Sequence, residues 1–296
     1  MFDHFICDFN AAYAVFELRP EDTQVVLAGA SSRLPASSAF SMYQEVAEAF
    51  SGAYPVESLE EAIKRAAGKA ADGRICLPRV IFSTWGHSSM QAAGSYFNMQ
   101  RMDLSVPYEC STSPILLGMR DFIVSRVVSS SDSRIAATRD DQSVPPDFAN
   151  GKTIRVLWPV RRTRLTGLED GILDMLRRVC REKNAQFIEQ DLSDLSFSEQ
   201  LSIVRSTNVL VGLHGAALTW AYFLPPNSSL IEISNEPASA RCFCFKTAAK
   251  SVGIGYNFIL FDRHRETDDD RHHQGDAKLY NAVKAAIDKA SGAKIL

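Results

Sequence analysis

A histidine and a glycine interrupt the most apolar part of the chain. Residues 208–213 (NVLVGL) end at His214 and Gly215, and the apolar stretch AALTWAYFL follows directly. Gly215 allows a ligand to approach the backbone closely. The N–H groups of Ala216, Ala217 and Leu218, at the start of a predicted helix, would attract an anion such as a phosphate, and the histidine can donate to an anionic oxygen. A tight strand-to-helix turn with a satisfied histidine is the alternative.

Three arginines follow another apolar stretch. Residues 153–160 (TIRVLWPV) run directly into Arg161, Arg162 and Arg164. A guanidinium group forms two parallel hydrogen bonds to a phosphate, so two or three of them after a buried strand can clamp a diphosphate. The alternative is a basic loop exposed to solvent.

Glu232 lies inside the apolar hexapeptide SLIEIS. Burial of a carboxylate is unfavourable unless the charge is paired, so this residue needs a partner. It follows His214 by about 18 residues, a spacing that suits the acidic residue that accepts a ribose diol in nucleotide-binding strand–helix–strand units. The alternative is that Glu232 neutralises a neighbouring arginine.

His4 and Asp8 are four residues apart in the segment FDHFICDF. Apolar residues at helical spacing predict a helix that ends at Leu18, and this helix would carry both side chains on one face. A histidine with a carboxylate one turn away can act as a general base with its orienting partner. A local pair exposed to solvent is the alternative.

The elements that position these residues are most regular in the second half of the chain. Apolar runs predict strands at 153–160, 185–192, 208–213 and 229–234, and periodic patterns predict helices at 168–183, 196–207 and 216–224. The second of these helices begins with a capping box, Ser196 and Glu199. Apolar strands that alternate with helices indicate a parallel sheet covered on both faces. We therefore expect a Rossmann-like domain, whose ligands bind at the carboxyl ends of the strands, where the histidine and the arginines lie.

The first half of the chain is mixed. Its patterns predict a strand at 24–29, helices at 39–51, 58–70 and 113–128, and one or two strands at 75–84. Residues 129–150 are rich in Ser and Asp and contain two consecutive prolines, so they are the best candidate for a linker. We therefore divide the chain into an N-terminal domain (1–135), a C-terminal domain (151–265) and a closing helix (275–296).

The composition excludes several classes of function. The formal net charge is −3 and the isoelectric point is about 6.1, so the broad basic surface of nucleic-acid-binding proteins is missing and we expect no nucleic-acid partner. No apolar run is long enough to span a bilayer, and the first residues do not have the pattern of a signal peptide. We expect a soluble core that can lack its targeting segment.

Neither the acidic residues nor the cysteines predict a metal site. We find no convincing Asp-x-Asp motif near a strand end, and we interpret residues 267–276 (TDDDRHHQGD) as an exposed charged loop. The six cysteines fit no zinc-binding spacing. We expect buried or free thiols, with one or two disulfides as the alternative, and we expect no metal.

Three segments of the chain carry a resemblance to a known family. Residues 196–234 resemble the signature of glycosyltransferase family 61, in which a helix with a Gln precedes a strand, an HGA-x-L turn and a Pro-rich approach to a strand with a glutamate. FDHFICDF is similar to the family's aromatic-His-x-x-x-Asp start, and WPVRRTR is similar to its Arg-rich strand end. The resemblance covers about residues 2–234 in the order of the family.

This resemblance implies a GT-B-like α/β fold, in which two Rossmann-like domains with parallel sheets face each other across a cleft. It implies inverting transfer of N-acetylglucosamine, xylose or arabinose from a UDP-sugar to a hydroxyl of a protein or polysaccharide. The reaction would need neither a cofactor nor an obligatory metal, and it would take place in the secretory pathway, in the Golgi or ER lumen. The residues that the resemblance places at the donor nucleotide are Arg161, Arg164, His214, Gly215 and Glu232. His4 and Asp8 would lie on the acceptor side, in the N-terminal domain.

Three positions differ from the family pattern. HGAALTW stands where the family usually has HGAGLTN, so Ala217 and Trp220 replace a glycine and an asparagine, and Leu168 stands where an asparagine is usual. We expect the methyl group of Ala217 to narrow the approach of a phosphate. The changes at 217 and 220 favour a catalytically inert nucleotide-sugar-binding or scaffold protein as the alternative function. A UDP-sugar epimerase or hydrolase with a similar two-domain fold is a further alternative.

Overall fold

The computed structural model describes residues 20–27, 38–52, 54–67, 112–138, 153–160, 169–234, 244–260 and 269–292. The predicted N-terminal helix, the predicted strands at 75–84 and residues 139–150 of the predicted linker lie outside these ranges. Within the ranges, no helix is both long enough and apolar enough to cross a bilayer.

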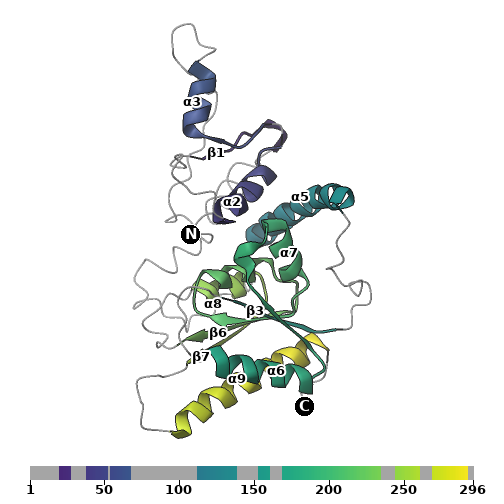
Figure 1. The fold of residues 1–296 in the computed structure, drawn as a ribbon, viewed down its shortest axis with the longest axis vertical. Coiled ribbons are helices and arrows are strands. Elements are labelled where there is room, and N and C mark those ends of the chain that lie inside the picture. Colours follow the sequence, from purple (N-terminus) through teal and green to yellow (C-terminus); the bar gives the residue numbers. More distant parts are fainter. Residues whose placement is uncertain are drawn as a thin grey trace.

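A five-stranded parallel sheet forms the centre of the second half of the chain (Figure 1). Its strands are β3 (Arg155–Pro159), β4 (Gln186–Gln190), β5 (Val209–Leu213), β6 (Ser229–Ser234) and β7 (Gly255–Leu260). They lie in the order β4-β3-β5-β6-β7, and every neighbouring pair is parallel. The predicted parallel α/β sheet is confirmed, whereas β7 has no counterpart among the predicted strands. The GT-B arrangement of two domains stays a prediction.

Helices follow the strands and cover the sheet. They are α6 (Glu169–Glu182), α7 (Phe197–Arg205), the 3-10 helix η4 (Ala216–Phe223), α8 (Cys244–Ser251) and α9 (Asp269–Ala290). The predicted capping box of α7 is present, because Ser196 Oγ accepts from the Glu199 N–H (3.3 Å) and the Glu199 carboxylate accepts from the Ser196 N–H (2.8 Å). β5 and β6 are buried along their whole length, as expected for strands with helices on both faces.

The helix after β5 differs from the prediction. The segment forms the 3-10 helix η4 instead of an α-helix, and the Leu218 N–H donates to the Gly215 carbonyl three residues earlier (2.9 Å). Every side chain from Leu218 to Phe223 is buried. Because this segment is short and buried from Leu218 onward, burial rather than intrinsic helix propensity determines its conformation. The predicted helix is therefore present, but it is a 3-10 helix.

The two faces of the sheet have separate apolar cores. α6 and α9 cover one face, where Leu176 and Val283 pack with Trp158 of β3. α7, η4 and α8 cover the opposite face, where Leu201 packs in the cluster that contains Leu157. Neighbouring residues of one strand thus contribute to different cores, as the alternation of side chains along a strand requires.

Two helices of the first half belong to the second of these cores. They are α2 (Ser38–Ala49) and α5 (Pro114–Thr138), and they contribute Val46 and Ile123 to the cluster of Leu157. The Glu45 carboxylate of α2 also accepts hydrogen bonds from the N–H groups of Phe197 and Ser198, each at 3.0 Å. These N–H groups lie at the start of α7, so α2 caps a helix of the sheet domain. The predicted boundary between the two domains stays a prediction.

The remaining described elements of the first half are short. They are η1 (Pro20–Asp22), β1 (Val26–Leu27), β2 (Glu57–Ser58) and α3 (Leu59–Ala67), and β1 pairs with β2 in parallel. η3 (Leu192–Asp194) is a further single turn before α7.

α5 is longer than the sequence predicts. It continues to Thr138, so residues 129–138 are helical and the predicted linker is wrong for this part. Once a helix has been nucleated, each added residue forms another hydrogen bond at little cost, and Ser and Asp are only slightly weaker helix formers than most residues. A polar composition therefore does not end the helix.

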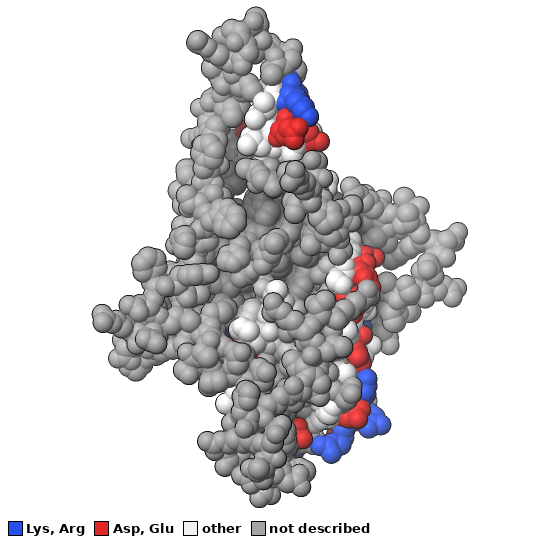
Figure 2. All heavy atoms as spheres, turned by 60° about the vertical axis from the view of Figure 1, so that its left-hand side comes forward, with Lys and Arg blue, Asp and Glu red and all other residues white. Residues whose placement is uncertain are grey.

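On the face shown in Figure 2, Lys and Arg side chains adjoin Asp and Glu side chains at the top and near the bottom of the view. On α3, for example, Lys64 pairs with Glu60 at 2.8 Å. Exposed pairs of this kind contribute little to stability. Among the described residues, this face carries no broad patch of one sign.

Candidate functional site

The order of the strands places a reversal of the chain between β3 and β5. α6 follows β3 and packs on one face of the sheet, whereas η4 follows β5 and packs on the other. β3 and β5 are parallel neighbours in the sheet, with Leu157 opposite Leu210. In open α/β sheets, ligands bind at the carboxyl ends of the strands where such a reversal occurs. His214 and Gly215 directly follow β5 at this point.

The turn after β5 has a backbone conformation that only glycine adopts readily. Gly215 has φ 150° and ψ −179°, a combination that is almost restricted to glycine. The His214 N–H donates to the Ile233 carbonyl of β6 (2.8 Å), which fixes the turn to the sheet. Within the described part of the chain, the N–H groups of Ala216 and Ala217 donate to no backbone carbonyl. The third predicted donor, the Leu218 N–H, is not free, because it donates to the Gly215 carbonyl. The turn thus presents two amide donors next to His214.

Close packing under this turn requires a second glycine. A Cβ atom at Gly212 of β5 would lie 2.9 Å from Leu218 Cδ2 and 3.5 Å from Pro159 Cγ. A real Cβ atom needs more space than this, so a larger residue would displace Leu218. Glycine in a strand often marks such a close approach of a neighbouring segment. The absence of a side chain at position 212 lets η4 pack directly against β5.

A chain of hydrogen bonds across two strands holds the His214 ring. Glu232 belongs to β6, and its Oε1 lies 2.5 Å from His214 Nδ1. Its Oε2 accepts a hydrogen bond from the Tyr256 hydroxyl of β7 (2.7 Å). Glu232 is only 2 % exposed, whereas the side chain of His214 is 29 % exposed. The imidazole also packs against the Phe245 ring of α8 in a T-shaped arrangement, with 5.3 Å between the ring centroids. This arrangement leaves Nε2 as the ring nitrogen that can meet a ligand.

The sequence that contains this turn matches a known protein family. The Glycosyltransferase 61 family profile matches residues 2–231. The chain belongs to glycosyltransferase family 61. Its relatives include EGF domain-specific O-linked N-acetylglucosamine transferases from Drosophila melanogaster (35 % identical over 109 residues) and Bos taurus (29 % identical over 116 residues). The matches cover 35 % and 38 % of this chain, and 19 % and 21 % of those two proteins. The matched part thus spans about a fifth of each relative.

Trp220 stands where family 61 usually has an asparagine, and the structure places it in the core. Its side chain is 3 % exposed and stacks on Phe197 with 5.3 Å between the ring centroids and 27° between the planes. It also packs against Phe223. Large buried aromatic side chains contribute mainly to packing. The indole ring therefore joins η4 to α7 through packing.

Ala217 stands where family 61 usually has a glycine. Its side chain is half-buried, and it directly follows the exposed Ala216. The methyl group thus lies beside the two amide donors of the turn. Its effect on a bound phosphate stays a prediction.

The observed partners of Glu232 differ from those expected for either predicted role. Its contact with a ribose stays a prediction, and both of its carboxylate oxygens already have partners in the structure. Among the described residues, its hydrogen-bonded partners are a histidine and a tyrosine and not an arginine. This geometry favours a role in orienting the imidazole. A carboxylate that accepts from a histidine ring nitrogen fixes the tautomer and the plane of the ring.

The sequence reasoning missed two residues that contact this pair, Tyr256 and Phe245. Tyr256 lies in the strand GYNFIL, and an aromatic residue is ordinary in a strand. It reaches Glu232 because β6 and β7 pair with Leu230 opposite Tyr256. The sequence carries no motif that predicts this register, so the tyrosine could be found only in the structure.

The other predicted site residues lie outside the residues that the structure describes. They are His4, Asp8, Arg161, Arg162 and Arg164. Their roles stay predictions. Within the described ranges, no group of three or more His, Cys, Asp or Glu side chains is placed to hold a metal ion.

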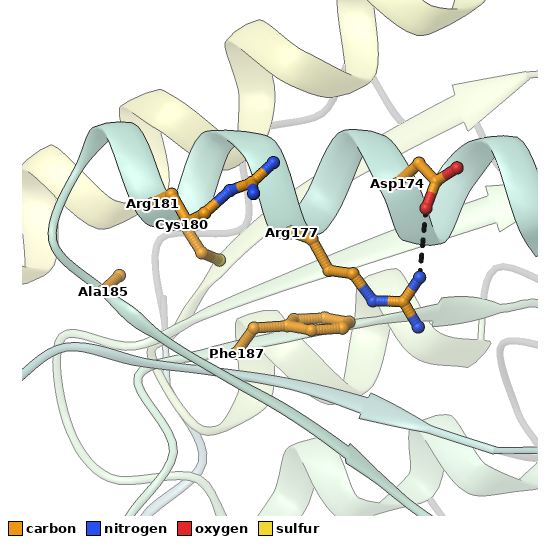
Figure 3. A pocket seen from close by; sticks show the side chains of 6 residues that line it. All are labelled: Asp174, Arg177, Cys180, Arg181, Ala185 and Phe187. Carbon is orange, nitrogen blue, oxygen red and sulfur yellow. Dashed lines mark hydrogen bonds and ion pairs between the residues drawn. The ribbon is translucent and has the colours of Figure 1, made fainter.

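A separate cavity of about 530 Å³ lies at the outer edge of the sheet, between α6 and β4 (Figure 3). Its lining residues are Asp174, Arg177, Cys180, Arg181, Ala185 and Phe187. Arg177 is neutralised by Asp174 (3.1 Å) and Glu189 (2.8 Å). Burial raises the pKa of the Cys180 thiol to about 11, so the thiol is protonated at neutral pH and is a poor nucleophile. This cavity contains none of the predicted site residues, and the turn after β5 is the better candidate.

Proposed function

We propose that this protein transfers a sugar from a UDP-sugar to a hydroxyl group of a protein or polysaccharide, with inversion at the anomeric carbon. The observation that carries this proposal is the His214 ring, held on the buried Glu232 beside the open amides of Ala216 and Ala217. This group lies at the carboxyl end of β5, at the point where open α/β sheets bind their ligands. Membership of family 61 supports glycosyl transfer as the reaction.

The site would stabilise the departing UDP. In an inverting transfer, the bond between the anomeric carbon and the diphosphate oxygen breaks, and negative charge grows on the diphosphate. The amides of Ala216 and Ala217 would donate hydrogen bonds to its oxygens, and His214 would donate through Nε2 when its ring is protonated. Arg161, Arg162 and Arg164 follow β3, the strand next to β5, and would supply positive charge. We propose no metal for this role.

A base must take the proton of the acceptor hydroxyl as it attacks from the opposite face of the sugar. We propose His4 for this role, with Asp8 as its orienting partner in the N-terminal domain. The acceptor would then lie between the two domains of a GT-B fold, opposite the donor.

N-acetylglucosamine is the first donor sugar to test, because the named relatives are N-acetylglucosamine transferases that act on EGF domains. Xylose and arabinose are the other donor sugars that we propose to test. By the same resemblance, we propose the secretory pathway as the place of action. The matches cover only part of those relatives. The EGF domain is therefore proposed as the first acceptor to test.

One observation favours a second candidate function. Ala217 places a methyl group beside the amide donors where family 61 usually has a glycine. A methyl group that keeps the diphosphate out of its reactive position would leave a protein that binds a nucleotide sugar without transferring it.

The deciding experiment measures UDP release from UDP-N-acetylglucosamine, UDP-xylose and UDP-arabinose, with and without an EGF-domain acceptor. His214→Ala is expected to lower acceptor-dependent release about 100-fold, as is typical for the loss of one donor to a developing anion, and Arg164→Ala should lower it in the same direction. Arg177→Ala in the α6–β4 cavity is the matched control and should leave it unchanged. UDP binding without release supports the inert protein, and absence of UDP binding contradicts the site assignment.

A further inference from the structure

Tyr256 is the one member of the hydrogen-bonded chain that nothing in the sequence pattern pointed to. Its hydroxyl donates to Glu232 Oε2 at 2.7 Å, while Glu232 Oε1 meets His214 Nδ1 at 2.5 Å. We propose that Tyr256 is a positioning residue, which orients the Glu232 carboxylate so that His214 presents Nε2 to the diphosphate of the donor. This inference rests on the function proposed above.

The sheet register explains why Tyr256 can hold the carboxylate. Glu232 lies opposite Phe258, and Leu230 lies opposite Tyr256 in the parallel pairing of β6 with β7. Tyr256 is thus the diagonal neighbour of Glu232 on the same face of the sheet, a distance that an aromatic side chain can bridge. The phenol oxygen reaches one carboxylate oxygen, and the other oxygen stays turned toward β5 and His214.

Burial makes this contact decisive for the orientation of the carboxylate. Glu232 is 2 % exposed, so water cannot replace a lost hydrogen-bond donor. A buried oxygen without its donor favours a rotated or protonated carboxyl group, because an unpaired buried charge is unfavourable. Either change alters what His214 Nδ1 meets and therefore which ring nitrogen carries the proton. The effect of Tyr256 on a ligand would thus pass through Glu232 and His214.

The protein contains a similar tyrosine–glutamate hydrogen bond that does not contact His214. The Tyr280 hydroxyl of α9 donates to the Glu182 carboxylate of α6 at the protein surface. Tyr280→Phe removes the same hydroxyl from the same kind of partner, and it does so on the opposite face of the sheet. It therefore serves as the matched control for Tyr256→Phe, which keeps the phenyl ring and its packing.

The test is a double-mutant cycle on UDP affinity, measured by calorimetry with wild type, Tyr256→Phe, His214→Ala and the double variant. Tyr256→Phe is expected to weaken UDP binding about tenfold in the wild-type background and to have no further effect when His214 is absent, because coupled residues are not additive. Tyr280→Phe should leave UDP affinity unchanged. Additive losses, or a Tyr256→Phe variant that binds UDP as tightly as wild type, would overturn the proposal.

A second measurement does not depend on the ligand. The ¹⁵N chemical shifts of the His214 ring report which nitrogen carries the proton, and comparison with His214→Ala assigns the signals. Tyr256→Phe is expected to shift them, whereas Tyr280→Phe is not, and unchanged shifts in Tyr256→Phe would refute the positioning role. If wild type bound no UDP, the proposed function would fail, and these shifts would still decide whether Tyr256 controls the histidine.

Discussion

The two faces of the parallel sheet are covered in different ways (Figure 1). α6 and α9 are regular α-helices, and the cluster that they form with the sheet is apolar. The opposite face has the 3-10 helix η4, and its layer contains the buried Glu232 and Gln200. It also receives α2 and α5 from the first half of the chain. The η4 face must accommodate a buried carboxylate and a buried amide in addition to its apolar residues.

The position of the polar groups explains this difference. Glu232 follows the alternation of β6, in which Ile231 and Ile233 face α6 and α9 while Leu230 faces the other side. The carboxylate therefore points toward η4 and α8, next to His214. The irregular helix and the buried carboxylate lie together because η4 begins in the turn after β5, and Glu232 of β6 bonds to His214 in that turn. We infer that the α6–α9 face supports the sheet and that the η4 face carries the function.

Two leucines that are fully buried, one on each face, provide the largest test of this comparison. Leu176→Ala and Leu218→Ala each leave a cavity and are expected to lower the free energy of unfolding by about 2–5 kcal/mol. Only Leu218→Ala should also weaken UDP binding, because Leu218 packs against Gly212 directly under the amide donors. Urea unfolding measures the first effect, and calorimetry at a temperature where both variants are folded measures the second. Equal loss of UDP affinity in both variants would remove the functional distinction between the faces.

Two glycines, one on each face, compare how tightly the faces are packed, because an alanine at each position adds one methyl group. Gly212→Ala places a Cβ atom 2.9 Å from Leu218 Cδ2 and is expected to destabilise the protein by about 1–3 kcal/mol through overpacking. Gly171 lies in α6, and a Cβ atom there meets nothing within 4 Å. Gly171→Ala should therefore stabilise the protein by about 0.5–1 kcal/mol, since alanine is the better helix former. Thermal unfolding of the two variants should shift in opposite directions, and a shift of the same sign would contradict the packing described for η4.

Four of the five strands of the sheet could be predicted from the sequence, and three of them, β3, β5 and β6, are nearly continuous apolar runs. β7 was missed, because its residues GYNFIL form a more polar pattern that includes Gly and Asn. The capping box also located the start of α7 correctly, since its two side chains interact within one turn. The conformation of η4 could not be predicted, because it depends on burial by segments such as α7 that are distant in sequence. The end of α5 was missed because of local composition. Ser and Asp suggested a linker, although both residues are tolerated in a helix that has already formed.

The candidate site could be predicted only as separate residues. His214 and Glu232 stand out in the sequence, one at a glycine turn and the other as a charge in an apolar strand. Their pairing depends on the register of β5 with β6, in which Gly212 lies opposite Glu232. The third member, Tyr256, depends in addition on the register of β6 with β7. Such registers are set by the packing of the whole sheet and cannot be read from one segment. The chemistry of a single residue can therefore be inferred from the sequence, but its partners cannot.

The last prediction concerns Cys180, which lies on the α6–α9 face. Burial raises the pKa of its thiol from 9.0 to about 11, so between these values the unfolded chain loses the proton while the native protein keeps it. The native state then binds more protons, and its stability falls as the pH rises. We expect this thiol to lower the free energy of unfolding by about 1 kcal/mol between pH 9 and pH 10. Urea unfolding of wild type and Cys180→Ala at both pH values isolates the contribution, because all other groups titrate in both proteins. Parallel pH dependence in the two proteins would show that the thiol is not buried against the sheet, and the apolar character of this face would then need revision.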